Sequence, residues 1–264
     1  MALLSFTAKT LVVVLSLVGV ASVAIVGPRQ LEATVRSLRD RVRAAGPSIG
    51  VLGVVLVINS LVREAGGDLM WMIGINITGY IHSVEGAFVA DVQSLATPML
   101  TEYFSFIYVY GYAFLLIFPV VLYLALESAE SLREMTMAYT LNYAIGLVFY
   151  VLFISFGPRN LIADQVQSLL YTDWPKAQLI TSQVNRNTNV FPSLHSSLSV
   201  TVALLAYRTR EHYPKWPVVA IPMAVSVVIA TMYLGIHWGT DVVTGVALGV
   251  FSVYAAERIR KRTS

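Results

Sequence analysis

Two histidines and one aspartate carry the most specific chemical signal in this chain. His195 stands at the head of one apolar stretch, His237 at the tail of the next, and Asp241 follows His237 by four residues. If the chain stays helical there, this spacing places the carboxylate over the imidazole, and if the chain turns, the pair remains within reach. An aspartate that holds one ring nitrogen raises the basicity of the other. His237 can therefore act as a nucleophile or a base.

The entrance to the stretch that contains His195 is polar and reads FPSLHSS, residues 191–197. Pro192 is well placed as the first residue of a helix. The free N–H groups of a helix start favour an anion, and Ser193 adds a hydroxyl. In the simpler interpretation, Ser193 only caps the helix. In the functional one, the entrance holds a phosphate.

Three cations, Arg159, Lys176 and Arg186, lie in the loop that leads to this entrance. Arginine forks match the tetrahedral oxygens of a phosphate, and lysine adds a point charge. The alternative is that these loop cations only contact lipid headgroups. We expect Arg159, Ser193, Lys176 and Arg186 to bind phosphate.

The elements that must position these residues are membrane helices. Of the 264 residues, 56% are apolar and 12% are charged, and the mean hydropathy of +0.70 is far outside the range of soluble domains. Because lipid forbids unpaired backbone groups, long apolar runs predict helices. Seven such runs cover about residues 9–26, 48–62, 103–126, 137–156, 192–207, 217–236 and 240–256. We expect an all-α polytopic transmembrane helical bundle of about seven spans, or six if the first is a cleaved signal peptide.

The distribution of cations predicts the orientation of the bundle. With seven spans, one side receives only five of the 18 Lys and Arg residues, namely Lys9, Arg63, Arg159, Lys176 and Arg186. The positive-inside rule then places the C-terminus in the cytoplasm and both histidines at the extracytoplasmic face. We expect an integral protein of the cell membrane.

Two further patterns concern packing in the second half of the chain. Gly245 and Gly249 form a small-xxx-small face that suits close approach of another helix. Tyr233 and Trp238 are expected at the depth of an interfacial aromatic belt.

The two histidine motifs together resemble a known family. FPSLHS at residues 191–196 and TMYLGIHWGTD at residues 231–241 are similar to the paired signatures of the type-2 phosphatidate phosphatase superfamily. The branch that contains the fungal inositol phosphorylceramide synthases is the most similar in PSLH and TMYL. The resemblance covers about residues 137–256 and implies phosphotransfer through a covalent phosphohistidine. In that mechanism His237 attacks phosphorus, Asp241 supports it, and His195 protonates the leaving oxygen and later activates the acceptor.

The chain departs from the general pattern of that superfamily at three points. Leu194 stands where many members have glycine, Thr231 stands where many have arginine, and no lysine is followed seven residues later by Arg-Pro. Pro158-Arg159 resembles the ending of the variant branch, so Arg159 is the best substitute ligand. These departures favour a transferase or another lipid phosphate over plain phosphatidate hydrolysis.

The predicted organisation has three parts. Residues 1–136 form N-terminal transmembrane helices, with an outer loop at 63–102 that we expect as short helices along the membrane surface. Residues 137–256 form the catalytic transmembrane core, and residues 257–264 form a basic cytoplasmic tail.

The leading hypothesis is a membrane phosphatase or phosphotransferase that acts on a lipid phosphate. The alternatives are a transporter or receptor in which His and Asp relay protons, and a vanadate-dependent haloperoxidase, which the hydropathy argues against. We expect lipid phosphate and membrane lipids as partners and no nucleic acid. We expect no cofactor and no metal, because the two histidines and the aspartate already have roles.

Overall fold

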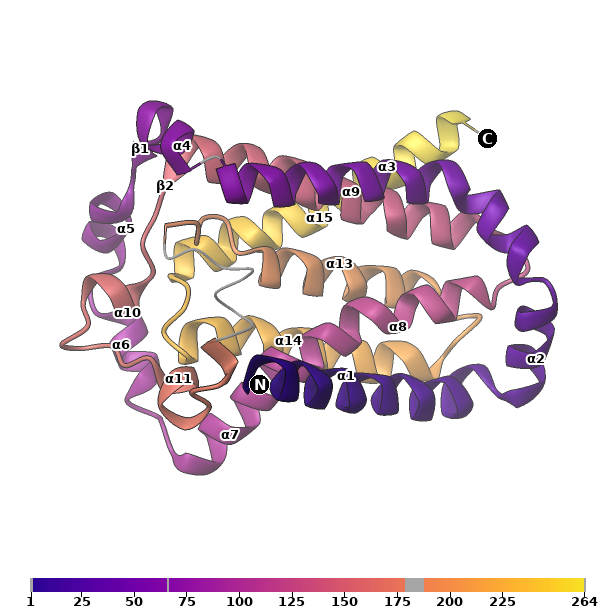
Figure 1. Ribbon diagram of the computed structural model, residues 1–264, viewed down its shortest axis with the longest axis horizontal. Helices are drawn as coiled ribbons and strands as arrows, with labels where there is room; N and C mark the ends of the chain where they lie inside the picture. The colour runs from indigo at the N-terminus through magenta and orange to yellow at the C-terminus, as the bar shows by residue number, and fades with distance from the viewer. Residues whose placement is uncertain (1, 66, 179–187, 264) are drawn as a thin grey trace.

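Six helices in the described chain are long and apolar enough to cross a membrane. The computed structural model describes residues 2–65, 67–178 and 188–263, and Figure 1 shows the long helices lying side by side. The spanning segments are Phe6–Val26, Leu38–Glu64, Pro98–Leu124, Glu130–Leu152, Lys215–Tyr233 and Gly239–Arg262. The protein is an integral membrane protein, and the predicted all-α polytopic bundle is confirmed.

The spanning segments are built from both regular and π-helical turns. The first joins α1 (Ala2–Ala21) to a π-helical turn, η1 (Ser22–Val26), and the third joins α7 (Pro98–Phe106), η2 (Ile107–Gly111) and α8 (Tyr112–Leu124). The others are α3 (Leu38–Ala65), α9 (Glu130–Leu152), α14 (Lys215–Tyr233) and α15 (Gly239–Thr263). Thr97 caps α7 by accepting a hydrogen bond from the backbone N–H of Leu100, and Pro98 occupies the first turn.

The fifth predicted apolar stretch, 192–207, forms the shorter helix α13 (Leu194–Arg208). Its 15 residues extend about 22 Å, less than the ~30 Å hydrocarbon layer. Figure 1 shows α13 in the middle of the bundle, between α15 and α14. Most of its residues, including Ser196, Ser197 and Thr201, are buried. Its polar side chains therefore meet other helices rather than lipid.

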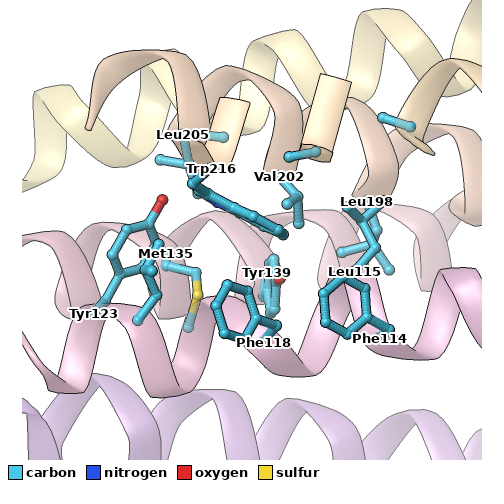
Figure 2. Packing of buried hydrophobic residues seen from close by; sticks show 14 of the residues in the cluster. Phe114, Leu115, Phe118, Tyr123, Met135, Tyr139, Leu198, Val202, Leu205 and Trp216 are labelled. Atoms are coloured by element: carbon cyan, nitrogen blue, oxygen red, sulfur yellow. The ribbon is translucent and has the colours of Figure 1, made fainter. Parts of the chain in front are cut away.

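The core around α13 is large and aromatic. Trp216, Phe118 and Leu198 are completely buried. Figure 2 shows side chains of α8, α9, α13 and α14 meeting in this core. Phe118 and Trp216 make an edge-to-face contact with ring centroids 4.9 Å apart. By contrast, valines of α1 and α3 such as Val12, Val20 and Val54 are exposed, as expected for surfaces that face lipid.

The packing of α13 against α15 depends on two glycines. A Cβ atom on Gly245 would lie 2.4 Å from the carbonyl oxygen of Ser193, and one on Gly249 would lie 2.4 Å from that of Ser197. Real Cβ atoms do not approach backbone so closely. The predicted small-residue face is therefore a tight helix contact. It holds α15 against the turn of α13 that carries His195.

Short elements cover the end of the bundle that carries His195 and His237, here called the site end. The predicted short helices of residues 63–102 are α4 (Gly67–Ile73), α5 (Thr78–Glu85) and α6 (Phe88–Gln93), and they are joined there by α10 (Pro158–Leu161) and α11 (Leu169–Asp173). Two-residue strands, β1 (Ile75–Asn76) and β2 (Phe153–Ile154), pair in parallel. At the opposite end, α2 (Pro28–Arg36) connects α1 to α3 (Figure 1).

Candidate active site

His237 and Asp241 meet because the chain turns between them. Helix α14 ends at Tyr233, Gly235 takes a positive φ of 72°, and α15 begins at Gly239. Of the two geometries predicted for the pair, the structure has the turn. Asp241 Oδ2 lies 3.4 Å from His237 Nδ1, with both side chains buried. The same oxygen accepts a hydrogen bond of 2.9 Å from the Trp238 N–H, which fixes the carboxylate beside the ring.

The His237 imidazole is neutral at physiological pH. Burial lowers the pKa of His237 to about 3, and the positive charge of Arg159 acts in the same direction. A neutral imidazole has a lone pair on one ring nitrogen, which is the state that a nucleophile requires.

His195 faces the same site from the first turn of α13. The centroids of its ring and of the His237 ring are 6.1 Å apart. Its side chain is partly exposed, whereas His237 is 4% exposed. The structure therefore brings the three predicted catalytic residues together, with His237 deep and His195 nearer the surface.

Two tyrosines that the sequence did not single out hold the His195 ring. Tyr108 stacks on it at 4.6 Å, and Tyr112 lies against it at 4.4 Å between centroids. Both come from the segment around η2, and such π-helical turns often occur at functional sites. The four-residue spacing of the tyrosines was visible in the sequence. It could not be distinguished from the aromatic residues of a membrane interface.

Ser193 is the N-cap of α13. Its hydroxyl oxygen accepts hydrogen bonds from the backbone N–H of Ser196, at 3.3 Å, and from the Ser196 hydroxyl, at 3.1 Å. Pro192 therefore precedes the N-cap rather than occupying the first helical position, because Ser193 takes the capping place. The Tyr150 hydroxyl donates to the Pro192 carbonyl at 3.2 Å and anchors this entrance to α9.

Arg159 lies beside the loop that carries His237. Its backbone N–H donates to the Gly235 carbonyl at 3.2 Å. Its guanidinium lies 4.6 Å above the ring of Tyr171 and donates to the Tyr171 hydroxyl at 3.2 Å. Its other terminal nitrogen, Nη1, is buried without a hydrogen-bond partner within the described protein. A buried guanidinium nitrogen with no acceptor fits an anionic ligand.

The two other predicted loop cations are not part of this buried group. Lys176 follows α11, and its side chain is exposed, because the loop turns its polar residues to the surface after Trp174. Arg186 lies outside the residues that the structure describes.

Residues distant in sequence shape the start of α15. The carboxylate of Glu85, in α5, accepts hydrogen bonds from the backbone N–H groups of Gly239 and Thr240. No local motif pointed to this cap, since the partners are 154 residues apart.

The prediction that Tyr233 and Trp238 lie in an interfacial aromatic belt is wrong, because both side chains are buried. The Trp238 indole donates to the Phe156 carbonyl at 2.8 Å and fastens the His237 loop.

The arrangement suits transfer of a group held between two imidazoles. A nucleophile approaches to about 3–3.5 Å in a near-attack complex, and a general acid lies ~2.6–3.2 Å from the oxygen it protonates. With their centroids 6.1 Å apart, both rings lie near enough to contact one phosphate. Among the described residues, no cluster of three His, Asp or Glu side chains is placed to hold a metal ion.

Comparison with known proteins identifies the family. A family model described as the PAP2 superfamily matches residues 80–255, two thirds of the chain. The chain belongs to the PAP2 superfamily. Neither a curated protein nor a solved structure gives a significant match. The PAP2 match includes His195, His237, Asp241 and Arg159 and leaves α1 to α4 outside. Membership in the PAP2 superfamily supports an enzyme with phosphatase-type activity on a phosphate ester.

Proposed function

We propose that the protein cleaves a lipid phosphate ester through a phosphohistidine intermediate. The observation that carries this proposal is the buried pair of His237 and Asp241 with His195 at 6.1 Å. A lipid is the fitting substrate because the site lies at one end of membrane-spanning helices, where a headgroup can enter while the acyl chains stay in the bilayer.

In the first step, the neutral His237 attacks phosphorus and forms a P–N bond. The P–O bond to the leaving alcohol breaks, and His195 donates a proton to the leaving oxygen. Asp241 stabilises the positive charge that His237 acquires. Arg159 binds the non-bridging oxygens, which become more negative in the transition state.

In the second step, His195 takes a proton from the acceptor. The acceptor oxygen attacks phosphorus, the P–N bond breaks, and His237 is regenerated. Water as the acceptor releases a free phosphate, and a lipid alcohol as the acceptor yields a new phosphate ester. The same residues serve both outcomes.

Transfer to a lipid alcohol, as in the inositol phosphorylceramide synthases that the motifs resemble, is the second candidate. Leu194 packs on Gly146 and in a cluster with Tyr150 and Leu248. The Thr231 hydroxyl donates to the Val228 carbonyl at 2.7 Å. Thr231 brings no charge where many members have arginine, and no lysine is followed seven residues later by Arg-Pro, so cationic ligands of the general phosphatase pattern are absent.

Trapping of the intermediate tests the proposal. Purified protein is mixed with phosphatidate carrying a ³²P-labelled phosphate and, separately, with phosphatidylinositol labelled in the same way, each with and without ceramide or diacylglycerol. We expect an acid-labile phosphoprotein with at least one donor. His237→Ala should abolish it, whereas His212→Ala, at an exposed position after α13, should retain it. Labelling of His237→Ala, or no turnover of either lipid by the native protein, would contradict the proposal. The alcohol-dependent product separates transfer from hydrolysis.

A further inference from the structure

A second arginine near the site comes from outside the family match. Arg63 is in the last turn of α3, 17 residues before the matched region begins at residue 80. The distribution of cations predicts that it lies on the same side of the membrane as the histidines. An arginine within a membrane-spanning segment is a candidate functional residue.

Three polar contacts fix α3 against α9 along their length. Near the end opposite the site, Arg133 donates to the Ala44 carbonyl through Nε, at 3.0 Å, and through Nη2, at 2.6 Å. The Thr136 hydroxyl bonds to Ser48 at 2.8 Å. Near the site end, the buried Asn59 amide donates to the Tyr143 carbonyl at 3.2 Å. The two helices therefore run parallel in a defined register.

This register places Arg63 beside Tyr150, the residue that anchors the entrance to α13. Arg63 lies one turn after Asn59 on the same face of α3. Its guanidinium carbon is 5.6 Å from the centroid of the Tyr150 ring. The hydroxyl of Tyr150 in turn contacts Pro192, three residues before His195. The Arg63 side chain is only partly exposed, and its Nε is buried.

The two arginines approach the site from different sides. Arg63 lies beside Tyr150, which bonds to Pro192 before His195, whereas Arg159 lies beside the loop that carries His237. A phosphate between the two rings would have one cation on each side. A phosphate dianion favours more than one positive partner when it leaves water, since an unpaired charge is costly to desolvate.

We infer that Arg63 is the second phosphate-binding cation of this site and replaces a ligand that the general phosphatase pattern supplies from elsewhere. This inference rests on the proposed function and deepens it. Helix α3 is then part of the binding site rather than only a membrane anchor.

Binding of orthovanadate tests the role of Arg63 without turnover. Orthovanadate mimics the phosphoryl group during transfer, and its affinity for purified protein in detergent is measured by calorimetry. Loss of one charge-assisted hydrogen bond should weaken binding by about 10- to 100-fold in Arg63→Gln. Arg63→Lys should bind more tightly than Arg63→Gln, because it restores the charge. Arg133→Gln is the matched control, since it removes a contact between α3 and α9 away from the site, and it should bind like the native protein.

The possible results separate this inference from the proposed function. If Arg63→Gln binds orthovanadate like the native protein while Arg159→Gln binds weakly, Arg63 is outside the site and the proposed function stands. If Arg133→Gln is weakened as much as Arg63→Gln, the effect comes from helix packing and the inference is wrong. If the native protein binds no orthovanadate and forms no phosphohistidine, both proposals are wrong.

Discussion

The two histidines have unequal surroundings, which suit unequal roles. His237 is buried beside Asp241, and the loss of solvation keeps its ring neutral. His195 is partly exposed and packs against two tyrosine rings, which restrict its orientation. The first environment suits a nucleophile, and the second suits an acid that exchanges protons with the acceptor.

His195→Ala should therefore depend on the leaving group. General acid catalysis contributes about 10²–10⁴-fold, and much of it is unnecessary when the leaving oxygen is already a stable anion. We expect a large loss with a lipid alkoxide leaving group and a much smaller loss with nitrophenolate. The comparison uses the burst phase, which reports the first half-reaction before acceptor attack. An equal loss with both substrates would assign His195 a different role.

Arg159 should contribute to binding more than to the chemical step. Arg159→Ala removes a guanidinium whose Nη1 is buried without a protein acceptor among the described residues, so phosphate loses a charge-assisted contact. We expect the Michaelis constant for a lipid phosphate to rise by about 10-fold or more. Tyr171→Phe is the control, because it removes the hydroxyl that Arg159 contacts but keeps the charge. A native Michaelis constant and turnover in Arg159→Ala would remove this residue from the site.

Helix α13 is held in place by close contacts and hydrogen bonds to its neighbours. Its first residues follow the Ser193 cap, its backbone touches α15 at Gly245 and Gly249, and the Ser197 hydroxyl donates to the Asn142 side chain of α9. The Asn142 amide also donates to Thr201 at 3.0 Å. These interhelical bonds explain why a central membrane helix carries so many hydroxyls.

Gly249→Ala should disturb both stability and activity. The added methyl would meet the Ser197 backbone, and since backbone cannot rotate away, α13 and His195 must shift. Overpacking of this kind costs about 1–3 kcal/mol or more, which thermal unfolding in detergent would detect. Gly53→Ala in α3 is the matched control, because nothing lies within 4 Å of the Cβ that this substitution would add, and alanine favours a helix. Equal stability of the two variants would mean that the α13–α15 contact tolerates a methyl group.

At the scale of the whole molecule, the candidate active site and the lipid-facing surface belong to different helices. The outer helices α1 and α3 expose apolar side chains over most of their length. The centre is α13, and the site end is covered by α5, α10 and α11 (Figure 1). The orientation predicted from the distribution of cations would place this covered end outside the cell.

The predicted orientation can be measured directly. The chain contains no cysteine. Single cysteines introduced at the exposed positions Gln178 and Arg210 are therefore the only thiols that a reagent can label. In sealed vesicles, a reagent that does not cross membranes should label position 178 from the extracytoplasmic side and position 210 from the cytoplasmic side. Labelling of both from one side would overturn the orientation.

The sequence by itself determined the class of structure and the family. Apolar runs of spanning length leave a helical bundle as the favourable fold in lipid, and the paired motifs around His195 and His237 pointed to the superfamily that the family match then established. These conclusions depend on local patterns. Asp241 was predicted beside His237 for the same reason, since four residues cannot separate far.

Only the tertiary structure decided which distant residues complete the site. Tyr108, Glu85 and Arg63 approach the motifs across gaps of dozens to more than a hundred residues, and their positions follow from helix register and loop closure rather than from local preference. Lys176 shows the converse, because a cation near the motif in sequence is exposed in space. The short α13 likewise owes its central place to packing against α9, α14 and α15, which apolar content alone does not encode.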